Sequence, residues 1–231
     1  AMAISLRAKI VGQKREDQQV IIHKPDIGES EKFSLNGLTY TKQRDYFKSG
    51  INICIGEGLV FSNGFECEIT SKIPIQAGVG SSSTVMVNWI HFLSQMADTP
   101  VIWNEKKIGE LAYKAESLEF NEPGGMMDQY SASMGHLLYL VFEPDLSIKS
   151  LNPSLGTFVL GDSCEPKDTM RILQRCRDAR IKIIQKLKGK NPDFNIHTND
   201  NVDLSLLNEE EKNIFHGTIK NRNILRQALS E

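Results

Sequence analysis

The stretch Pro74-Ile75-Gln76-Ala77-Gly78-Val79-Gly80-Ser81-Ser82-Ser83-Thr84 lies between a strand pattern and a helix pattern. Residues 64–73 alternate apolar and polar side chains, as a half-buried strand does. Residues 81–97 repeat apolar side chains at helical spacing. Glycines permit positive φ and close approach of a ligand to the backbone, and serines are good caps for the helix that follows. Because the N–H groups and positive dipole end of a helix face such a turn, the stretch predicts an anion site, with phosphate as the usual occupant.

This stretch differs from the Walker A loop, the commonest glycine-rich phosphate loop. No Gly-Lys-Ser/Thr sequence follows its glycines at the required spacing, so a lysine clamp on the phosphates is missing locally. The alternative interpretation is an ordinary loop that caps a helix, because short glycine motifs often match by chance. A second motif is needed to favour the anion site.

That second motif is Pro123-Gly124-Gly125-Met126-Met127-Asp128-Gln129-Tyr130, which places Asp128 at the expected start of a helix over 125–134. The macrodipole stabilises a carboxylate there, so Asp128 can stay charged at neutral pH. Two neighbouring methionines indicate a partly apolar setting. Glu116 is expected near the end of the preceding helix, 104–119, where it could meet a metal bound to phosphates. The alternatives are simple charge complementarity with the helix for Asp128, and a solvated surface residue for Glu116.

The composition is ordinary for a soluble globular protein, since 40% of the 231 residues are hydrophobic and 24% are charged. A net charge of −2 gives the chain no general attraction to nucleic acid or anionic membranes. No apolar run is long enough to cross a membrane. Cysteines without paired spacing predict reduced thiols in a cytoplasmic protein and argue against a zinc site: Cys54, Cys67, Cys164 and Cys176. The expected helix over 167–189 is basic, but no aromatic residues interleave with its charges, which favours a solvated face.

The chain is expected to divide near residue 153, where Asn152-Pro153-Ser154 is strong turn punctuation. Strands are expected over 3–12, 18–24, 64–73, 136–142, 146–150 and 157–161, with a short one near Phe33. Helices are expected over 45–59, 81–97, 104–119, 125–134 and 167–189, and two short helices are expected to close the chain. Asn104 is the expected cap of the helix that it begins.

Taken together, the two motifs resemble those of the GHMP kinases (galacto-, homoserine, mevalonate and phosphomevalonate kinases). The family's second motif, Pro-x-x-x-Gly-Leu-Gly-Ser-Ser-Ala, is matched by the stretch that begins at Pro74. The galactokinase sequence Gly-Ile-Met-Asp-Gln is matched closely by Gly125-Met126-Met127-Asp128-Gln129, with the Ala-Glu of residues 115–116 upstream as in that group. The resemblance implies an α+β fold. Residues 1–153 would form an N-terminal ATP-binding domain like domain 2 of ribosomal protein S5, lacking its first strands. Residues 154–231 would begin a ferredoxin-like C-terminal domain.

The resemblance also implies roles for individual residues, with ATP and Mg²⁺ as cofactors. Ser82 and Glu116 would hold Mg²⁺. Asp128 would orient or deprotonate the attacking sugar hydroxyl, and Gly125 would contact the sugar beside it. The residues that would wrap the nucleotide phosphates are Pro74, Gly78, Val79, Gly80, Ser81, Ser82, Ser83 and Thr84.

The implied activity is ATP-dependent phosphorylation of a sugar hydroxyl, in the first place galactose to galactose 1-phosphate. One alternative is another acceptor, such as a heptose phosphate, an arabinose or an N-acetylhexosamine. The other is a sensor that binds ATP and sugar without turnover. Val79 and Ser83 replace the usual Leu and Ala, which leaves the sensor open, whereas Glu116 and Asp128 favour catalysis. The family's first and third motifs are not found, so the chain resembles a central portion that is expected to be inactive in isolation. The sequence fixes neither the acceptor nor the oligomeric state.

Overall fold

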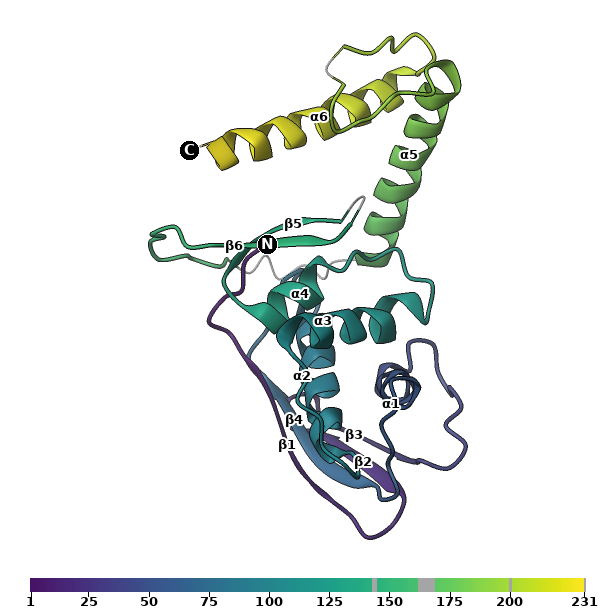
Figure 1. Cartoon of the computed structure of the whole chain (residues 1–231), viewed down its shortest axis with the longest axis vertical. Coiled ribbons are helices and arrows are strands. Elements are labelled where there is room, and N and C mark those ends of the chain that lie inside the picture. Colours follow the sequence, from purple (N-terminus) through teal and green to yellow (C-terminus); the bar gives the residue numbers. More distant parts are fainter. Residues whose placement is uncertain (143–144, 162–168, 200, 231) are drawn as a thin grey trace. The chain divides into compact units, whose positions relative to one another are not determined.

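The computed structural model of the chain describes residues 1–142, 145–161, 169–199 and 201–230 (Figure 1). The chain divides into two compact units, Ala1–Asp168 and Thr169–Glu231. The domain boundary expected near residue 153 concerns the family's domains and stays a prediction, as does the ferredoxin-like assignment of the residues after it.

A four-stranded sheet in the order β1-β4-β2-β3 is the base of the first unit. Its strands are β1 (Ala8–Lys14), β2 (Gln19–Lys24), β3 (Glu29–Ser34) and β4 (Phe65–Ser71). β2 and β4 pair in parallel, whereas β1 with β4 and β2 with β3 pair antiparallel. Parallel neighbours need a crossover connection, and the chain between β2 and β4 makes it through β3 and a helix. The strands predicted over 18–24, near Phe33 and over 64–73 are confirmed as β2, β3 and β4.

Helices pack against this sheet and against each other (Figure 1). Those of the first unit are α1 (Tyr46–Gly56), α2 (Ser81–Met96), α3 (Glu105–Tyr113) and α4 (Met127–Met134). Asn104 caps α3 as predicted, since its side chain accepts a hydrogen bond from the backbone N–H of Lys107 at 2.8 Å. A π-helical turn, η2 (Lys114–Leu118), continues α3 and was not predicted.

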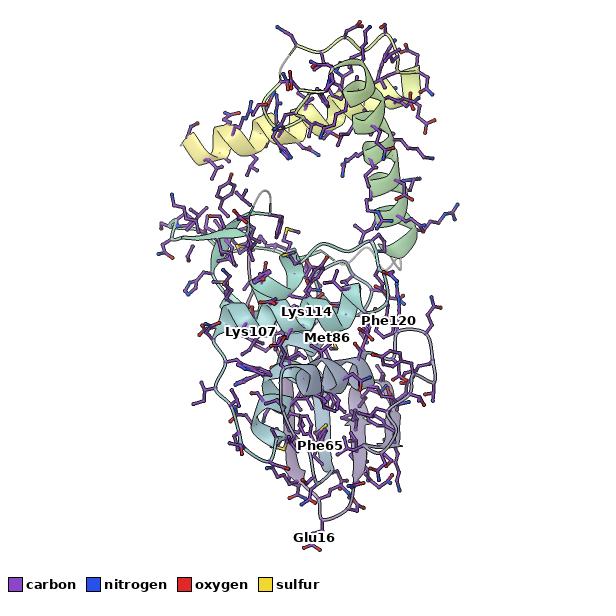
Figure 2. The ribbon with its side chains drawn as sticks, turned by 45° about the vertical axis from the view of Figure 1, so that its right-hand side comes forward. Glu16, Phe65, Met86, Lys107, Lys114 and Phe120 are labelled. Carbon is purple, nitrogen blue, oxygen red and sulfur yellow. The ribbon has the colours of Figure 1, made fainter. Side chains whose placement is uncertain are left out.

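The core between the sheet and these helices is aromatic at its centre. Phe65 of β4 and Trp89 of α2 are fully buried, with ring centroids 5.7 Å apart. Figure 2 shows Phe65 on the sheet and Met86, also buried, in the helical layer. Gly50 of α1 permits this packing, because a Cβ there would lie 2.5 Å from the Trp89 ring. Burying each such side chain contributes about 1.5–3 kcal/mol, so this layer holds α2 and its N-terminus in place on the sheet.

The N-terminal residues do not continue β1 as far as predicted. β1 begins at Ala8, and Met2 instead forms a bridge to Leu137 at the edge of a second sheet. That sheet is the hairpin of β5 (Leu137–Val141) and β6 (Ser147–Leu151), close to the ranges predicted for it. The alternation of the first residues is satisfied by pairing with a different strand, which periodicity alone cannot distinguish.

Two predictions about the rest of the chain are wrong. Residues 157–161 form no strand, and Val159 is 93% exposed, because no described strand lies beside them to pair with their backbone groups. The chain closes with one long helix, α6 (Glu209–Ser230), in place of two short ones. Gly217 lies in its interior, but an interior glycine destabilises a helix by only about 1 kcal/mol. Packing of α6 on the small core through Phe215 offsets this cost.

The second unit pairs α6 with α5 (Thr169–Lys190). Its small core comprises the buried side chains Ile183, Leu187, Phe194, Leu207 and Phe215. No helix among the described residues combines the length and apolar character of a membrane span. Burial raises the pKa of the Cys54 and Cys67 thiols to about 12, which makes both of them unreactive core residues. Cys164 lies outside the described residues.

Candidate functional site

The predicted phosphate loop is a turn with repeated positive φ that leads directly into α2. Gln76, Gly78 and Gly80 have φ values of 58°, 75° and 70°. Gly80 is the N-cap of α2, and no side-chain hydrogen bond caps this end of the helix. The prediction that the serines cap the helix is therefore corrected: Ser81, Ser82 and Ser83 occupy its first turn, because the left-handed conformation at the cap favours glycine. The first N–H groups of a helix have no intrahelical partner, so this end can bind an anion.

We expect Gly80→Ala to destabilise the fold by about 1–2 kcal/mol, because an alanine at φ near 70° is strained. An added Cβ would lie 3.6 Å from the Asp128 carboxyl, an ordinary contact, so the effect comes from the backbone. Urea unfolding measures it. Gly56→Ala at the end of α1 is the matched control, since it meets open space without positive φ and should be neutral or slightly stabilising. Equal effects of the two substitutions would contradict this assignment.

Asp128 lies beside the N-terminus of α2, although 48 residues separate it from Gly80. It is the second residue of α4, as predicted, and an added Cβ at Gly80 would lie 3.6 Å from both its Cγ and its Oδ2. Both residues line one cavity of about 580 Å³, together with Gly78, Val79 and Thr84. The structure thus brings an exposed carboxylate to the place where the sequence predicts phosphate.

Glu116 interacts with the first turn of α2 and is nearly buried, with 4% of its surface exposed. It belongs to the π-helical turn η2, a type of turn that is frequent at functional sites. Burial raises the pKa of the Glu116 carboxyl, hydrogen bonds from Ser82 and Ser83 oppose the rise, and the charge of Asp128 adds to it. Glu116 is therefore no solvated surface residue. It interacts with side chains of the same turn that would hold phosphate.

The buried end of this site is completed by Gln129, the residue after Asp128. Its Nε2 donates to Oε2 of Glu116 at 2.6 Å and to Oγ of Ser83 at 3.2 Å. Ser49 of α1 supports the π-helical turn by donating to the backbone oxygen of Ala115 at 2.7 Å. Polar contacts from three helices thereby fix the position of Glu116.

Glu116 and Ser82 offer the oxygen donors that Mg²⁺ prefers, and they are near enough for Ser82 to lower the pKa of the Glu116 carboxyl. No group of three or more His, Cys, Asp or Glu side chains that could hold a metal ion occurs in the described part of the chain. Mg²⁺ needs no such cage when substrate phosphates supply ligands, because one or two carboxylates then suffice. The residues present fit a magnesium ion bound together with a nucleotide.

The other predicted site residues lie around this centre at different depths. Pro74 is half-buried at the start of the loop, and Ser81 is half-buried at the first position of α2. Gly125 is exposed, three residues before Asp128, and is not among the residues that line the cavity. The Ser83 side chain is buried against Glu116 and Gln129, so any contact with a nucleotide must come from its backbone N–H.

Sequence reasoning assigned no role to three residues that complete the site. Gln129 is part of the acidic motif given above. Its position directly after Asp128 on a short helix was the signal that could have predicted a buried side chain. Arg7 and Asn88 line the cavity beside Asp128, but they reach it from the N-terminal segment and from α2. No local pattern brings these distant segments together, so the sequence held no signal for them.

Comparison with known families gives a match over the centre of this site. Residues 45–136 match the family model described as the GHMP kinases N terminal domain, which includes α1, the phosphate loop, Glu116 and Asp128. The heptose 7-phosphate kinase of Campylobacter jejuni (D-glycero-alpha-D-manno-heptose 7-phosphate kinase) is 31% identical over 182 residues, which are 77% of this chain and 51% of that protein. The galactokinase of Pyrococcus furiosus is 29% identical over 142 residues, or 61% of this chain and 39% of that protein. The mevalonate kinase of the same organism is 28% identical over 149 residues, or 60% and 44%.

Solved structures agree on the fold. The Lactococcus lactis galactokinase complexed with galactose superposes with a TM-score of 0.67 at 17% identity, covering 98% of this chain and 63% of that one. A D-glycero-D-manno-heptose 1-phosphate kinase from a Bacteroides species gives a TM-score of 0.56 at 19% identity, covering 64% and 49%. The chain spans about half the length, or less, of the curated relatives described above.

Proposed function

We propose that this chain, which belongs to the GHMP kinase family over residues 45–136, is the nucleotide-binding part of an ATP-dependent sugar kinase. The observation that carries the proposal is the position of Asp128 against Gly80, at the N-terminus of α2. A carboxylate would oppose phosphate binding at that place unless it served the acceptor. Its presence beside an anion-binding helix end supports a kinase that transfers a phosphoryl group over a protein that only binds the nucleotide.

In this proposal the helix end positions the ATP phosphates and Asp128 prepares the acceptor. The backbone N–H groups of the loop and of the first turn of α2 bind the β- and γ-phosphates. Asp128 accepts the proton of a sugar hydroxyl, whose oxygen bonds to the γ-phosphorus as the bond to the leaving ADP oxygen breaks. Glu116 and Ser82 would hold Mg²⁺, which neutralises charge on the β- and γ-oxygens when bound. Positioning and electrostatic stabilisation together account for phosphoryl transfer without a covalent intermediate.

For the acceptor we propose a sugar of the galactose type, which the match at residues 125–129 supports. A phosphorylated sugar is the second candidate, on two observations. The heptose 7-phosphate kinase of Campylobacter jejuni matches over most of this chain. Of the described residues that line the cavity, Arg7 alone has a cationic side chain, and it lies on the same cavity as Asp128. An arginine there could pair with a phosphate on the acceptor.

A substrate panel tests this proposal. We expect the whole protein, given MgATP, to phosphorylate either galactose or a heptose 7-phosphate, with mevalonate as the non-sugar comparison. ³¹P NMR identifies the new phosphate ester. If the phosphorylated acceptor is the substrate, Arg7→Ala should raise its KM at least tenfold while leaving the KM for ATP unchanged. Tight binding of ATP and sugar without any product would instead support a sensor, and phosphorylation of mevalonate alone would contradict a sugar kinase.

A further inference from the structure

Gln129 connects the elements that carry the proposed catalytic and metal-binding groups. It is 2% exposed on α4, next to Asp128, and its amide nitrogen reaches both Glu116 of η2 and Ser83 of α2. Ser83 in turn adjoins Ser82, the other proposed magnesium ligand. One side chain therefore joins α4, the π-helical turn and the first turn of α2.

The oxygen of the same amide indicates why a glutamine occupies this position. Gln129 Oε1 is buried, and no described group donates a hydrogen bond to it. An unpaired buried oxygen is unfavourable for folding, and such groups are uncommon in native structures. Turning the amide over would point Oε1 at the Glu116 carboxylate and lose both donated hydrogen bonds. The arrangement therefore places both amide hydrogens on the Glu116 side at the expense of the oxygen.

Packing alone does not explain a glutamine at this position. A methionine has a similar length and leaves no unpaired oxygen, so a residue chosen for core stability would be apolar. Polar interactions with Ser82 and Ser83 of α2 already lower the pKa of the Glu116 carboxyl. What Gln129 adds is a direct hydrogen bond to the carboxylate from α4, the helix of Asp128.

We propose, on the basis of the proposed kinase function, that Gln129 is a positioning residue that aims Glu116 at the metal ion accompanying the nucleotide. It acts through Glu116 and does not contact the phosphates itself. Partners that orient a metal ligand typically change metal affinity ten- to a hundredfold when they are removed. The effect should therefore appear in metal-dependent nucleotide binding and be absent from metal-free binding.

The test is calorimetric titration of the whole protein with AMP-PNP, a non-hydrolysable ATP analogue, once with Mg²⁺ and once with EDTA. We expect Gln129→Met to weaken binding at least tenfold with Mg²⁺ and to change it less than about twofold in EDTA. Gln95→Met is the matched control. Gln95 is a half-buried glutamine of α2 whose Nε2 donates to the backbone oxygen of Val101, remote from Glu116 in the sequence, and its substitution should change neither titration.

A double-mutant cycle separates action through Glu116 from a general effect on folding. In a Glu116→Gln background, Gln129→Met should cause no further loss of the AMP-PNP affinity measured with Mg²⁺, whereas a general effect on the fold would lower it again. Equal losses with Mg²⁺ and in EDTA, no loss in either, or full additivity in the cycle would overturn the positioning role. If Gln129→Met does not fold, Gln129→Asn, which keeps the amide but shortens its reach, gives the same comparison. A wild-type protein that binds no nucleotide would remove the proposed function itself, and the inference with it.

Discussion

Asp128→Asn is expected to lower kcat by about 10²–10⁴-fold while the affinity for MgATP stays within about twofold of wild type. The substitution keeps the size of the side chain and its place at the start of α4, but the amide cannot accept the proton of the acceptor hydroxyl. Removing a negative charge beside the phosphate loop should not weaken nucleotide binding, and it relieves repulsion with the γ-phosphate. Steady-state kinetics and calorimetry on the same preparation measure the two effects.

The control for this substitution is Asp145→Asn, an exposed aspartate in the connection between β5 and β6. It should leave both kcat and nucleotide affinity unchanged. Unchanged turnover in Asp128→Asn would remove Asp128 from the chemistry. A parallel loss of turnover and of nucleotide affinity would show that the residue only maintains the loop.

Glu116→Gln is expected to stabilise the protein without ligands at pH 8 by about 1 kcal/mol and to remove the gain in AMP-PNP affinity that Mg²⁺ gives to the wild type, while metal-free binding remains. The stabilisation follows because a carboxylate that is 4% exposed is unfavourable when ionised, whereas an amide of the same shape can keep the hydrogen bonds. The loss of the magnesium effect follows because Mg²⁺ then lacks the carboxylate ligand proposed for it. Thermal unfolding with and without Mg²⁺ and AMP-PNP measures both effects.

The pH dependence of this effect has a definite sign. Because burial raises the pKa of Glu116 above its ordinary value of 4.5, the folded state retains the proton to higher pH than the unfolded state. The contribution of protonated Glu116 is fully present below pH 4.5 and is lost as the pH rises through the folded-state pKa. The stability gained by Glu116→Gln should therefore grow between pH 4.5 and pH 8.

Glu68→Gln on β4 serves as the control, because its side chain is exposed and its substitution should show no such growth. A Glu116→Gln protein that is less stable than wild type at every pH, or that still binds AMP-PNP more tightly with Mg²⁺, would contradict the assignment of Glu116.

Local patterns in the sequence were sufficient for much of this site. Alternation before residue 74 and helical spacing after residue 81 located the glycine-serine turn before α2, and the glycines before Asp128 located the start of α4. These features depend on neighbours within a few residues, and local chemistry decides them. The cap formed by the side chain of Asn104 could also be predicted locally, since its hydrogen bond joins residues only three positions apart.

The remaining features depend on contacts between distant segments. The burial of Glu116 follows from the packing of η2 on α1 and α2, which no periodicity records. Residues 157–161 have the composition of a strand, but a strand forms only where a neighbouring strand hydrogen-bonds with its backbone N–H and C=O groups. Positive φ at Gln76, a buried carboxylate at Glu116 and an unpaired oxygen on Gln129 all break local rules within one small region. Several unfavourable local features in one region are expected at functional sites, where the arrangement of the functional groups takes precedence over stability.

The central claim is that the N-terminus of α2 binds the ATP phosphates beside Asp128. A crystal structure of the whole protein with Mg²⁺ and AMP-PNP tests it most directly. We expect phosphate oxygens on the backbone N–H groups of residues 80–84, with the γ-phosphate facing Asp128 across a space for the acceptor hydroxyl. A triphosphate bound elsewhere, with the loop after Pro74 empty, would contradict it.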